Sequence, residues 1–303
     1  MTVGLILAAA VSLLAGCGLR AAAPTATAAA PFGAGPAKEY AVGERTLALQ
    51  RGADRPLPTT IWYPAEGEPD GDTHTDAPPA TGRFPVVLFS HGLDSLPERH
   101  RGLASRWAAA GFVVAAPAYP HTAAGVRRFD RADVRNQPAD AWYVLQQVTG
   151  LDTDPGDPLA GRLDTARLAA AGHSAGGFTT AGLFTTGHDP RLRAAIVIAG
   201  GGMAGAFAGP PAAVLFVHGD ADRVVPLETG QAAYARVRWP AAFLRLLGQG
   251  HGNYLIPGRP GFDQVVAATL DVLRWRLYGD ATARDRLPAD GTADGIARLT
   301  ARL

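Results

Sequence analysis

Short, wholly apolar runs alternate with helical periods along most of the chain, and this alternation limits its possible folds more than any other feature. The apolar runs cover residues 85–90, 113–117, 168–173, 194–200, 213–219 and 242–248. Strands that are buried on both faces of a parallel sheet have this composition. Segments with the apolar periodicity of a helix lie between and after them, at residues 98–110, 132–148, 175–185, 227–237 and 262–278. The pattern predicts an α/β fold with a mostly parallel, doubly wound sheet that carries helices on both faces.

The segments that flank this alternation have weaker patterns. Residues 45–50 and 59–64 are half-alternating runs with turn residues between them, which predicts two opening antiparallel strands. Residues 70–82 are polar and rich in Pro, Asp and Thr, and we expect them to form a surface loop. The tail after Asp280 is less regular, and residues 242–248 are expected to be the last strand. No linker interrupts residues 39–278, so we expect one domain over residues 39–303.

The amino terminus has the composition of an export signal. Residues 1–16 are apolar and uncharged, are too short to span a bilayer comfortably, and are expected to be a signal peptide. They end in the string LAGC, which resembles a bacterial lipobox, so we expect Cys17 to be lipidated and to anchor the protein at the cell membrane. Secretion without the lipid is the alternative. Residues 17–38 are rich in Ala, Pro and Thr, which predicts a flexible tether.

Charge and motif content exclude several kinds of partner. The chain has 28 basic and 27 acidic residues, so it has no large positive field that could hold nucleic acid. Its histidines lack the spacing of a metal site, and no glycine-rich phosphate-binding string follows a strand. We therefore expect no cofactor, no metal and no nucleic acid. The chain is expected to be a monomer, and its single cysteine allows no disulfide within the chain.

The most specific motif is Gly172-His173-Ser174-Ala175-Gly176, which follows an apolar strand and opens a helical period. This context is typical of a nucleophile elbow, in which a strained turn exposes the serine hydroxyl above the sheet. A glycine-rich turn with a helix-capping serine is the alternative interpretation. A serine nucleophile needs a base that removes its proton and an acid that orients the base, and elbow-bearing folds carry them in the order Ser, Asp or Glu, His.

Candidates for the acid and the base follow in that order. His251 lies in a glycine-rich loop after residues 242–248, and no histidine follows it, so we expect His251 to be the base. Asp220 and Asp222 both follow the strand run 213–219. Asp222 is favoured as the acid, and Asp220 is then a turn residue. His218 is expected to be a structural histidine at the strand end.

An oxyanion hole requires two backbone N–H groups directed at the developing charge. We expect one from Ala175, directly after the nucleophile, and one from Leu93, in the loop after residues 85–90. Gly92 would let the substrate approach. His121, in the loop of residues 119–133, is a candidate substrate contact and otherwise a surface residue.

Several stretches together are similar to a known family, namely TTIWYPA, FPVVLFSHGL, GFVVAAPAYPHT, DPLAGRLDTARLAAAGHSAGG and HGDADRVVP. With them the chain resembles lidless bacterial α/β-hydrolases of the dienelactone-hydrolase-like and platelet-activating-factor-acetylhydrolase-like group, near the polyester-cleaving cutinases. The resemblance implies an α/β-hydrolase fold and ester hydrolysis, with Ser174, Asp222 and His251 as the catalytic triad.

The spacing of two apolar runs bears on the substrate. Only residues 200–211, mostly Gly, Ala and Pro, separate the fourth run from the fifth, and they are too few to build a cap domain. We expect an open cleft suited to esters presented at a surface or as chain ends. The chain is thus expected to be an exported serine esterase that acts through an acyl-enzyme. The alternatives are a serine peptidase or amidase with the same triad, and a surface-binding lipoprotein that has lost catalysis.

Overall fold

The computed structural model describes residues 1–2 and 35–303. All but the first two residues of the predicted signal peptide, Cys17 and most of the predicted tether lie outside the described residues. Gly35 and Pro36 already contact the folded domain, because a Cβ atom on Gly35 would lie 3.2 Å from the ring of Tyr278 and one on Gly111 would lie 2.6 Å from Pro36. The described domain therefore includes residues that precede Glu39.

Ten strands of the described chain form a sheet in the order β10-β9-β8-β7-β6-β4-β5-β2-β1-β3. The strands from β5 to β9 in this order pair in parallel, whereas β1 and β2 are antiparallel at one side and β10 is antiparallel at the other. This arrangement confirms the predicted parallel sheet with antiparallel opening strands. The strands are β1 (Ala41–Arg51), β2 (Arg55–Ala65), β3 (Thr73–Thr75), β4 (Phe84–Ser90), β5 (Val113–Pro117), β6 (Leu163–His173), β7 (Leu192–Ile198), β8 (Ala213–Gly219), β9 (Ala241–Leu246) and β10 (Ala297–Arg302).

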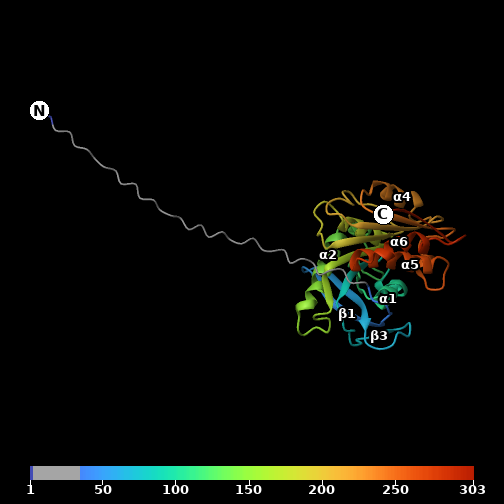
Figure 1. Ribbon diagram of the computed structural model, residues 1–303, viewed down its shortest axis with the longest axis horizontal. Helices are drawn as coiled ribbons and strands as arrows, with labels where there is room; N and C mark the ends of the chain where they lie inside the picture. The colour runs from blue at the N-terminus through green and yellow to red at the C-terminus, as the bar shows by residue number, and fades with distance from the viewer. Residues whose placement is uncertain (3–34) are drawn as a thin grey trace. The chain divides into compact units, whose positions relative to one another are not determined.

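Helices cover both faces of the sheet, as the alternating pattern predicts. The α-helices are α1 (Arg101–Ala109), α2 (Gln137–Gly150), α3 (Ala175–Leu183), α4 (Leu227–Arg236), α5 (Phe262–Leu273) and α6 (Ala281–Asp290). Short 3₁₀ turns are η1 (Pro97–His100), η2 (Arg131–Arg135), η3 (Leu151–Thr153) and η4 (Asn253–Leu255), and α5 continues into the π-helical turn η5 (Arg274–Tyr278). Figure 1 shows α5 and α6 packed beside each other.

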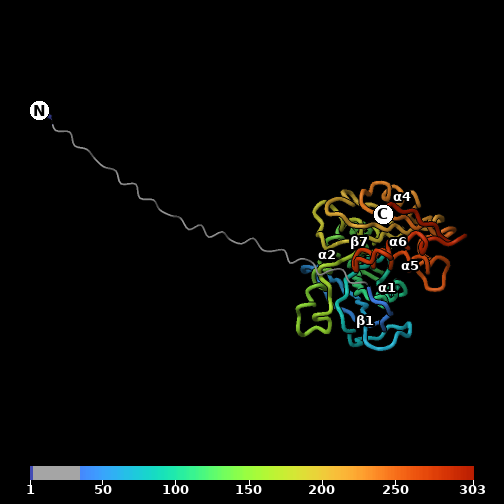
Figure 2. The backbone as a smooth tube through the Cα atoms, viewed as in Figure 1, coloured from blue at the N-terminus to red at the C-terminus, as the bar shows by residue number. Residues whose placement is uncertain are grey.

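Each face of the sheet has its own apolar core. Val87 and Phe89 of β4 belong to the core under α1, α5 and α6, whereas Val86 and Leu88 belong to the core under α2, α3 and α4. Successive side chains of a strand point to opposite faces, so a strand that feeds both cores must be apolar throughout. Figure 2 shows α4 and β1 at opposite sides of the domain, in agreement with the strand order.

Three elements differ from the sequence-based expectation. β3 lies within the predicted surface loop 70–82, where its three polar residues pair with β1. The tail after Asp280 contains α6 and the edge strand β10, so residues 242–248 do not hold the last strand. α6 buries only Ala283 and Leu287, so its sequence has almost no apolar periodicity from which a helix could be predicted. These elements are short or one-sided, and such segments carry little hydrophobic pattern.

The strand order reverses at β4, and this reversal creates the place for a site. The chain runs from β4 to β5 on one side and then crosses to β6 on the other side of β4. The connection that follows β4 therefore runs toward β5, whereas the connection that follows β6 runs in the opposite direction, toward β7. In open α/β sheets, ligands bind in the crevice at the carboxyl ends of the strands at such a reversal.

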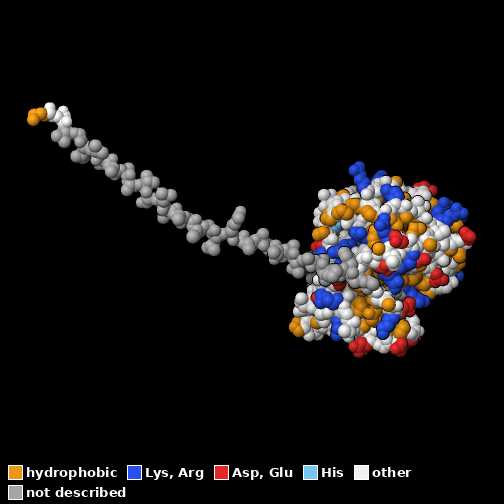
Figure 3. Space-filling view, in the orientation of Figure 1, with side chains coloured by type: hydrophobic (Ala, Val, Ile, Leu, Met, Phe, Trp, Pro, Cys, Tyr) orange, Lys and Arg blue, Asp and Glu red, His pale blue; other side chains and the backbone are white. Residues whose placement is uncertain are grey.

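No helix forms between β7 and β8 in the structure, so the described chain carries no cap at this position. None of the described helices is long and apolar enough to cross a bilayer. On the face seen in Figure 3, basic, acidic and apolar side chains are interspersed.

Candidate active site

Ser174 occupies the tight turn between β6 and α3, with the backbone angles φ 57° and ψ −120°. A non-glycine residue rarely adopts a positive φ, so the turn is strained, as the motif predicts. The flanking glycines explain how the chain can form it. A Cβ atom at Gly172 would lie 2.2 Å from the carbonyl oxygen of Gly176, and one at Gly176 would lie 1.9 Å from that of Ser90. Backbone contacts on both sides therefore exclude any side chain at these two positions.

The structure brings Ser174, His251 and Asp222 together. The hydroxyl of Ser174 lies 2.8 Å from Nε2 of His251, and Nδ1 of His251 lies 2.8 Å from Oδ2 of Asp222. The other carboxylate oxygen of Asp222 accepts hydrogen bonds from the backbone N–H groups of Val224 and Val225, at 2.8 and 3.0 Å. The three side chains thus form a continuous hydrogen-bonded relay.

The charge state of Asp222 determines which ring nitrogen of His251 carries the proton. Burial acts to raise the pKa of Asp222, but the hydrogen bonds from His251, Val225 and Val224 outweigh it and lower the pKa below its usual value. The carboxylate is therefore ionised at neutral pH and accepts the Nδ1 proton of His251. Nε2 is then unprotonated and can accept the hydroxyl proton of Ser174.

Asp220 has different partners from Asp222. Its carboxylate accepts hydrogen bonds from the guanidinium of Arg245, at 2.9 Å, and from the backbone N–H of Gly248, at 2.7 Å. Asp220 therefore ties β9 to the start of the loop that carries His251. His218 is buried, and its Nε2 bonds the carbonyl oxygen of Val225 at 2.9 Å, within the loop that holds Asp222.

The two residues expected to form an oxyanion hole lie next to Ser174. Ala175 is the first residue of α3, where a backbone N–H has no acceptor within the helix. Leu93 lines the same cleft as Ser174. Gly92 packs directly on the elbow, since a Cβ atom there would lie 3.1 Å from Cβ of Ser174. A larger residue at position 92 would therefore push the Leu93 loop away from the elbow.

Ser174 opens into a cleft of about 460 Å³, and no α-helical residue of the described chain lines it. The cleft has apolar walls from Leu93, Leu255 and Ile256. Polar side chains of Arg99 and His100 face it as well. The open cleft agrees with the short connection between β7 and β8.

His121 is not among the residues that line this cleft. Its carbonyl oxygen accepts the N–H of Asp130, and the next residue, Thr122, accepts the N–H of Asp94 at 2.8 Å. His121 thus belongs to a loop that hydrogen-bonds the Leu93 loop, and it does not reach Ser174 in this structure.

Two further histidines, His173 and His100, lie beside the catalytic candidates, and the sequence analysis did not anticipate them. The ring of His173 lies 4.8 Å from that of His251 and 5.5 Å from that of His100. Nε2 of His173 donates a hydrogen bond to the carbonyl oxygen of His251, at 2.5 Å, and so holds the His251 loop on the elbow. His173 occupies the position directly before Ser174 in the elbow motif. This position was a sequence signal that could have identified it as a neighbour of the site.

His100 carries no comparable sequence signal, because it lies in an ordinary helical period. It is 5% exposed and lines the cleft, and neither ring nitrogen has a hydrogen-bond partner among the described residues. Burial, together with the charges of His173, His91 and Arg99, holds the pKa of His100 well below its usual value. A neutral imidazole with a free donor and a free acceptor is therefore present in the cleft wall.

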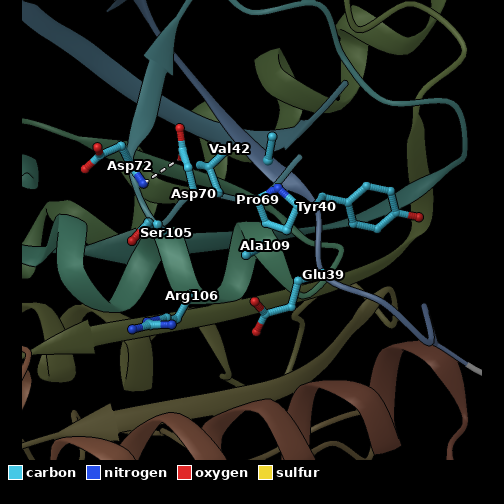
Figure 4. A pocket seen from close by; sticks show the side chains of 11 residues that line it. Glu39, Tyr40, Val42, Pro69, Asp70, Asp72, Ser105, Arg106 and Ala109 are labelled. Carbon is cyan, nitrogen blue, oxygen red and sulfur yellow. Dashed lines mark hydrogen bonds between the residues drawn. The ribbon is translucent and has the colours of Figure 1, made fainter. Parts of the chain in front are cut away.

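A further hollow lies between β1 and α1, lined by Tyr40, Pro69, Asp70, Ser105 and Arg106 among others (Figure 4). Its volume is about 40 Å³, which is too small for an ester substrate. Within the described chain, no group of His, Cys, Asp or Glu side chains is arranged to hold a metal ion. The cleft at Ser174 is the better candidate for the active site.

A mostly parallel sheet of this strand order, with a serine on the strand–turn–helix elbow, defines an α/β-hydrolase. A protein-family model described as PET hydrolase-like matches residues 58–244, which is more than half of the chain. The chain belongs to this family of polyester hydrolases related to cutinase-like enzymes, and it is a carboxylic ester hydrolase. The match includes Ser174 and Asp222 and ends before His251. No curated protein matches the chain.

Proposed function

We propose that this chain hydrolyses carboxylic esters through an acyl-enzyme formed on Ser174, with His251 as the base and Asp222 as the acid that orients it. The observation that carries this proposal is the relay of two 2.8 Å hydrogen bonds from Ser174 through His251 to Asp222. A serine hydroxyl is a weak nucleophile by itself, and such a relay is what activates it.

The geometry supports the following reaction. His251 Nε2 takes the proton of Ser174 while the serine oxygen attacks the ester carbonyl, and Asp222 stabilises the imidazolium that forms. The N–H groups of Leu93 and Ala175 stabilise the negative charge on the carbonyl oxygen. His251 then gives its proton to the departing alcohol. Water, activated by the same histidine, attacks the acyl-enzyme, which releases the acid and restores Ser174.

The proposed substrates are polyester segments and other esters that reach the enzyme at a surface. The open cleft and its apolar walls support this choice, because a long chain can lie across the site without threading under a cap. Two exposed apolar side chains also flank the relay. Val224, in the Asp222 loop, is 67% exposed, and Ile256, at the cleft, is 48% exposed. Both could contact an apolar polymer.

Replacement of Ser174 by alanine tests the mechanism. Ser174→Ala is expected to lower the hydrolysis of p-nitrophenyl butyrate and of a polyester film by at least about 10⁴-fold, since the nucleophile is lost. Circular dichroism should show an unchanged fold. Activity equal to that of the wild type would contradict the proposal. Failure of the wild-type chain to react with a fluorophosphonate would indicate a protein that has lost catalysis, and cleavage of anilides at rates comparable to esters would indicate an amidase.

We also propose that the enzyme is exported and held at the cell membrane by a lipid on Cys17. The LAGC string supports this location. Cys17→Ser is expected to abolish incorporation of a labelled fatty acid and to move the esterase from the membrane fraction. Labelling of the serine variant at the wild-type level would contradict the anchor.

A further inference from the structure

The two N–H groups of the proposed oxyanion hole come from different segments of the chain. Leu93 belongs to the loop that follows β4, whereas Ala175 is the first residue of α3, after β6. Both donors must lie about 3 Å from the same carbonyl oxygen when its negative charge develops. The position of the Leu93 loop relative to α3 is therefore a requirement of the reaction, and the protein needs contacts that hold it.

The Leu93 loop is held by the segment that follows β5. The N–H of Asp94 donates to the carbonyl oxygen of Thr122, at 2.8 Å, and the N–H of Ala124 donates to that of Ser95, at 3.0 Å. Asp94 has a positive φ of 50°, a conformation that surrounding contacts must stabilise in a non-glycine residue. The position of Leu93 therefore depends on the position of Thr122.

The side chain of Gln137 connects Thr122 to α3. Gln137 is the first residue of α2 and is fully buried. Its Nε2 donates a hydrogen bond to Oγ1 of Thr122, at 2.6 Å, and its Oε1 accepts one from Oγ1 of Thr179, at 2.5 Å. Thr179 lies one helical turn after Ala175 in α3, and its Oγ1 is also 3.1 Å from the carbonyl oxygen of Ala175. These three side chains, of Thr122, Gln137 and Thr179, are called here the Gln137 bridge.

The Gln137 bridge is closed to water. Each of its three side chains is at most 1% exposed. Loss of one partner in such a place leaves the other partner buried and unpaired, which costs more than the loss of a hydrogen bond at the surface. An amide suits the central position because one planar group offers both a donor and an acceptor. A single residue thus links the two segments that supply the oxyanion donors.

We propose that Gln137 is a positioning residue that sets the distance between the N–H groups of Leu93 and Ala175. It acts through Thr122 on the Leu93 loop and through Thr179 on α3, and it is not among the residues that line the cleft. The proposal rests on the esterase mechanism proposed above. Loss of the bridge lets the Leu93 loop and α3 move relative to each other. This motion weakens binding of the transition state more than binding of the ester, because the charge on the carbonyl oxygen develops only in the transition state.

Replacement of Gln137 by methionine tests the proposal, because methionine has a similar length and makes neither hydrogen bond. Gln137→Met is expected to lower kcat for p-nitrophenyl butyrate by about 10–100-fold and to leave KM almost unchanged. An alkyl trifluoromethyl ketone gives a second measurement. Oγ of Ser174 adds to its carbonyl carbon, the hydroxyl proton passes to His251, and the carbonyl oxygen becomes the oxyanion. Its inhibition constant should rise by the factor by which kcat/KM falls.

A second variant shows whether the two ends of the bridge act together. Thr179→Val removes one end and keeps the shape of the side chain. Because both changes break one connection, the double variant Gln137→Met/Thr179→Val should lose about as much kcat as the more affected single variant, and not the product of the two losses. Thr179→Val alone must show the same pattern of kcat, KM and ketone inhibition, so the proposal stays testable if Gln137→Met does not fold.

Thr269→Val is the matched control. Thr269 of α5 is as buried as Thr179, and its hydroxyl also bonds the carbonyl oxygen four residues before it, that of Val265, at 2.6 Å. It accepts a hydrogen bond from a second buried side chain, Nε1 of Trp107, at 2.9 Å. Thr269→Val should therefore lower Tm as Thr179→Val does, but it should leave kcat and the ketone inhibition constant unchanged.

The outcomes separate the possible failures. Each rate is divided by the concentration of sites that a fluorophosphonate labels to completion, so unfolded protein does not lower kcat. If Gln137→Met and Thr179→Val keep the kcat and the ketone inhibition constant of Thr269→Val, Gln137 only stabilises the fold and the proposal is wrong. Losses that multiply in the double variant would also overturn it. A wild-type chain that reacts with neither the ketone nor the fluorophosphonate would instead contradict the esterase mechanism itself.

Discussion

At the scale of single residues, Asp220 and Asp222 lie two positions apart and have separate structural roles. Asp222 is buried and hydrogen-bonds Nδ1 of His251, whereas Asp220 bonds Arg245 and the backbone of Gly248. The difference arises because the turn after β8 directs Asp222 toward the elbow and Asp220 toward β9. The same residue type can therefore be expected to affect catalysis at one position and loop stability at the other.

Replacement of each aspartate by asparagine separates these roles. Asp222→Asn is expected to lower kcat for p-nitrophenyl butyrate by about 10⁴-fold, because the amide no longer holds His251 in the required tautomer. Asp220→Asn should lower kcat by less than about tenfold and should mainly lower Tm, since it weakens the contact with Arg245. A larger catalytic loss in Asp220→Asn than in Asp222→Asn would contradict the assignment.

His91 makes stability depend on pH. Its Nδ1 donates to the carbonyl oxygen of Gly92, at 2.6 Å, and its Nε2 accepts the N–H of Tyr119, at 3.1 Å, so the ring must be neutral. Burial lowers the pKa of His91 to about 4, against about 6.5 in the unfolded chain. Between these values the unfolded chain binds more protons, so stability is complete above pH 6.5 and falls as the pH drops toward 4.

We expect the urea midpoint of unfolding to decrease between pH 7 and pH 4.5, with His91 contributing up to about 3 kcal/mol. His91→Gln should make this decrease smaller, although the variant starts from a lower stability at pH 7. Gln147→Ala, at an exposed position whose side chain does not titrate, serves as the control and should leave the decrease unchanged. An identical pH dependence in His91→Gln and the wild type would show that His91 is not its source.

The grouping of Ser174, Asp222 and His251 was predictable from the sequence, and the position of His100 in the same cleft was not. Ser174, Asp222 and His251 were identified from a turn motif and from chain order, which are local signals. The ring of His100 packs against those of Phe89 and His173, and His173 is distant from it in the sequence. A histidine in a helical period has the same local pattern whether it faces a cleft or solvent, so the sequence alone could not distinguish these cases.

At the scale of elements, β2 and α2 are joined by a buried charge network. The guanidinium of Arg55 contacts both Asp133, at 2.7 Å, and Asp140, whose side chain is fully buried. Arg51 of β1 adds a hydrogen bond to Asp140, at 2.7 Å. The network links the antiparallel edge of the sheet to the helix that covers β4 and β5. Loss of Arg55 would leave a buried carboxylate with one partner fewer.

Arg55→Ala is expected to lower the free energy of unfolding by about 3 kcal/mol, the lower end of the cost of removing one partner of a buried ion pair, because Arg51 still compensates Asp140 in part. Chemical denaturation measures this difference. Arg101→Ala breaks the exposed pair with Glu44 and should cost less than about 1 kcal/mol. Similar costs for the two variants would mean that Asp140 finds another partner or is protonated.

The elements with a strong apolar period were predicted, and the elements at the margins were not. β4 to β9 have nearly continuous apolar sequence because both of their faces are covered. β10 is an edge strand of six residues, in which exposed residues alternate with one buried and two half-buried ones. Its pairing with β9 depends on the approach of a distant segment, which local sequence does not encode.

At the scale of the whole molecule, the last two elements complete the domain. β10 covers the free edge of β9, and Leu287 of α6 and Ala297 of β10 belong to the core under α1 and α5. Asp271 of α5 also pairs with Arg286 of α6, at 2.6 Å. The tail therefore contributes both to the sheet and to one of its two cores.

A chain that ends at Gly279 tests this contribution. We expect it to lose cooperative unfolding or to aggregate, because β9 becomes an unpaired apolar edge and the core loses its cover. Differential scanning calorimetry and light scattering measure the two outcomes. Deletion of residues 1–16, the predicted signal peptide, is the control and should leave Tm unchanged. A soluble truncated chain with the wild-type Tm would show that the tail is dispensable.

The close contact between Gly176 and the carbonyl oxygen of Ser90 limits how this enzyme can change over evolution. Because backbone packs on backbone there, saturation of positions 172 and 176 should yield no functional substitute, so the geometry of the nucleophile is inherited as a fixed unit. Variation in substrate preference must then come from the loops that surround it, around Leu93 and around Leu255 and Ile256. A search for variants with new ester preferences should start with these loops.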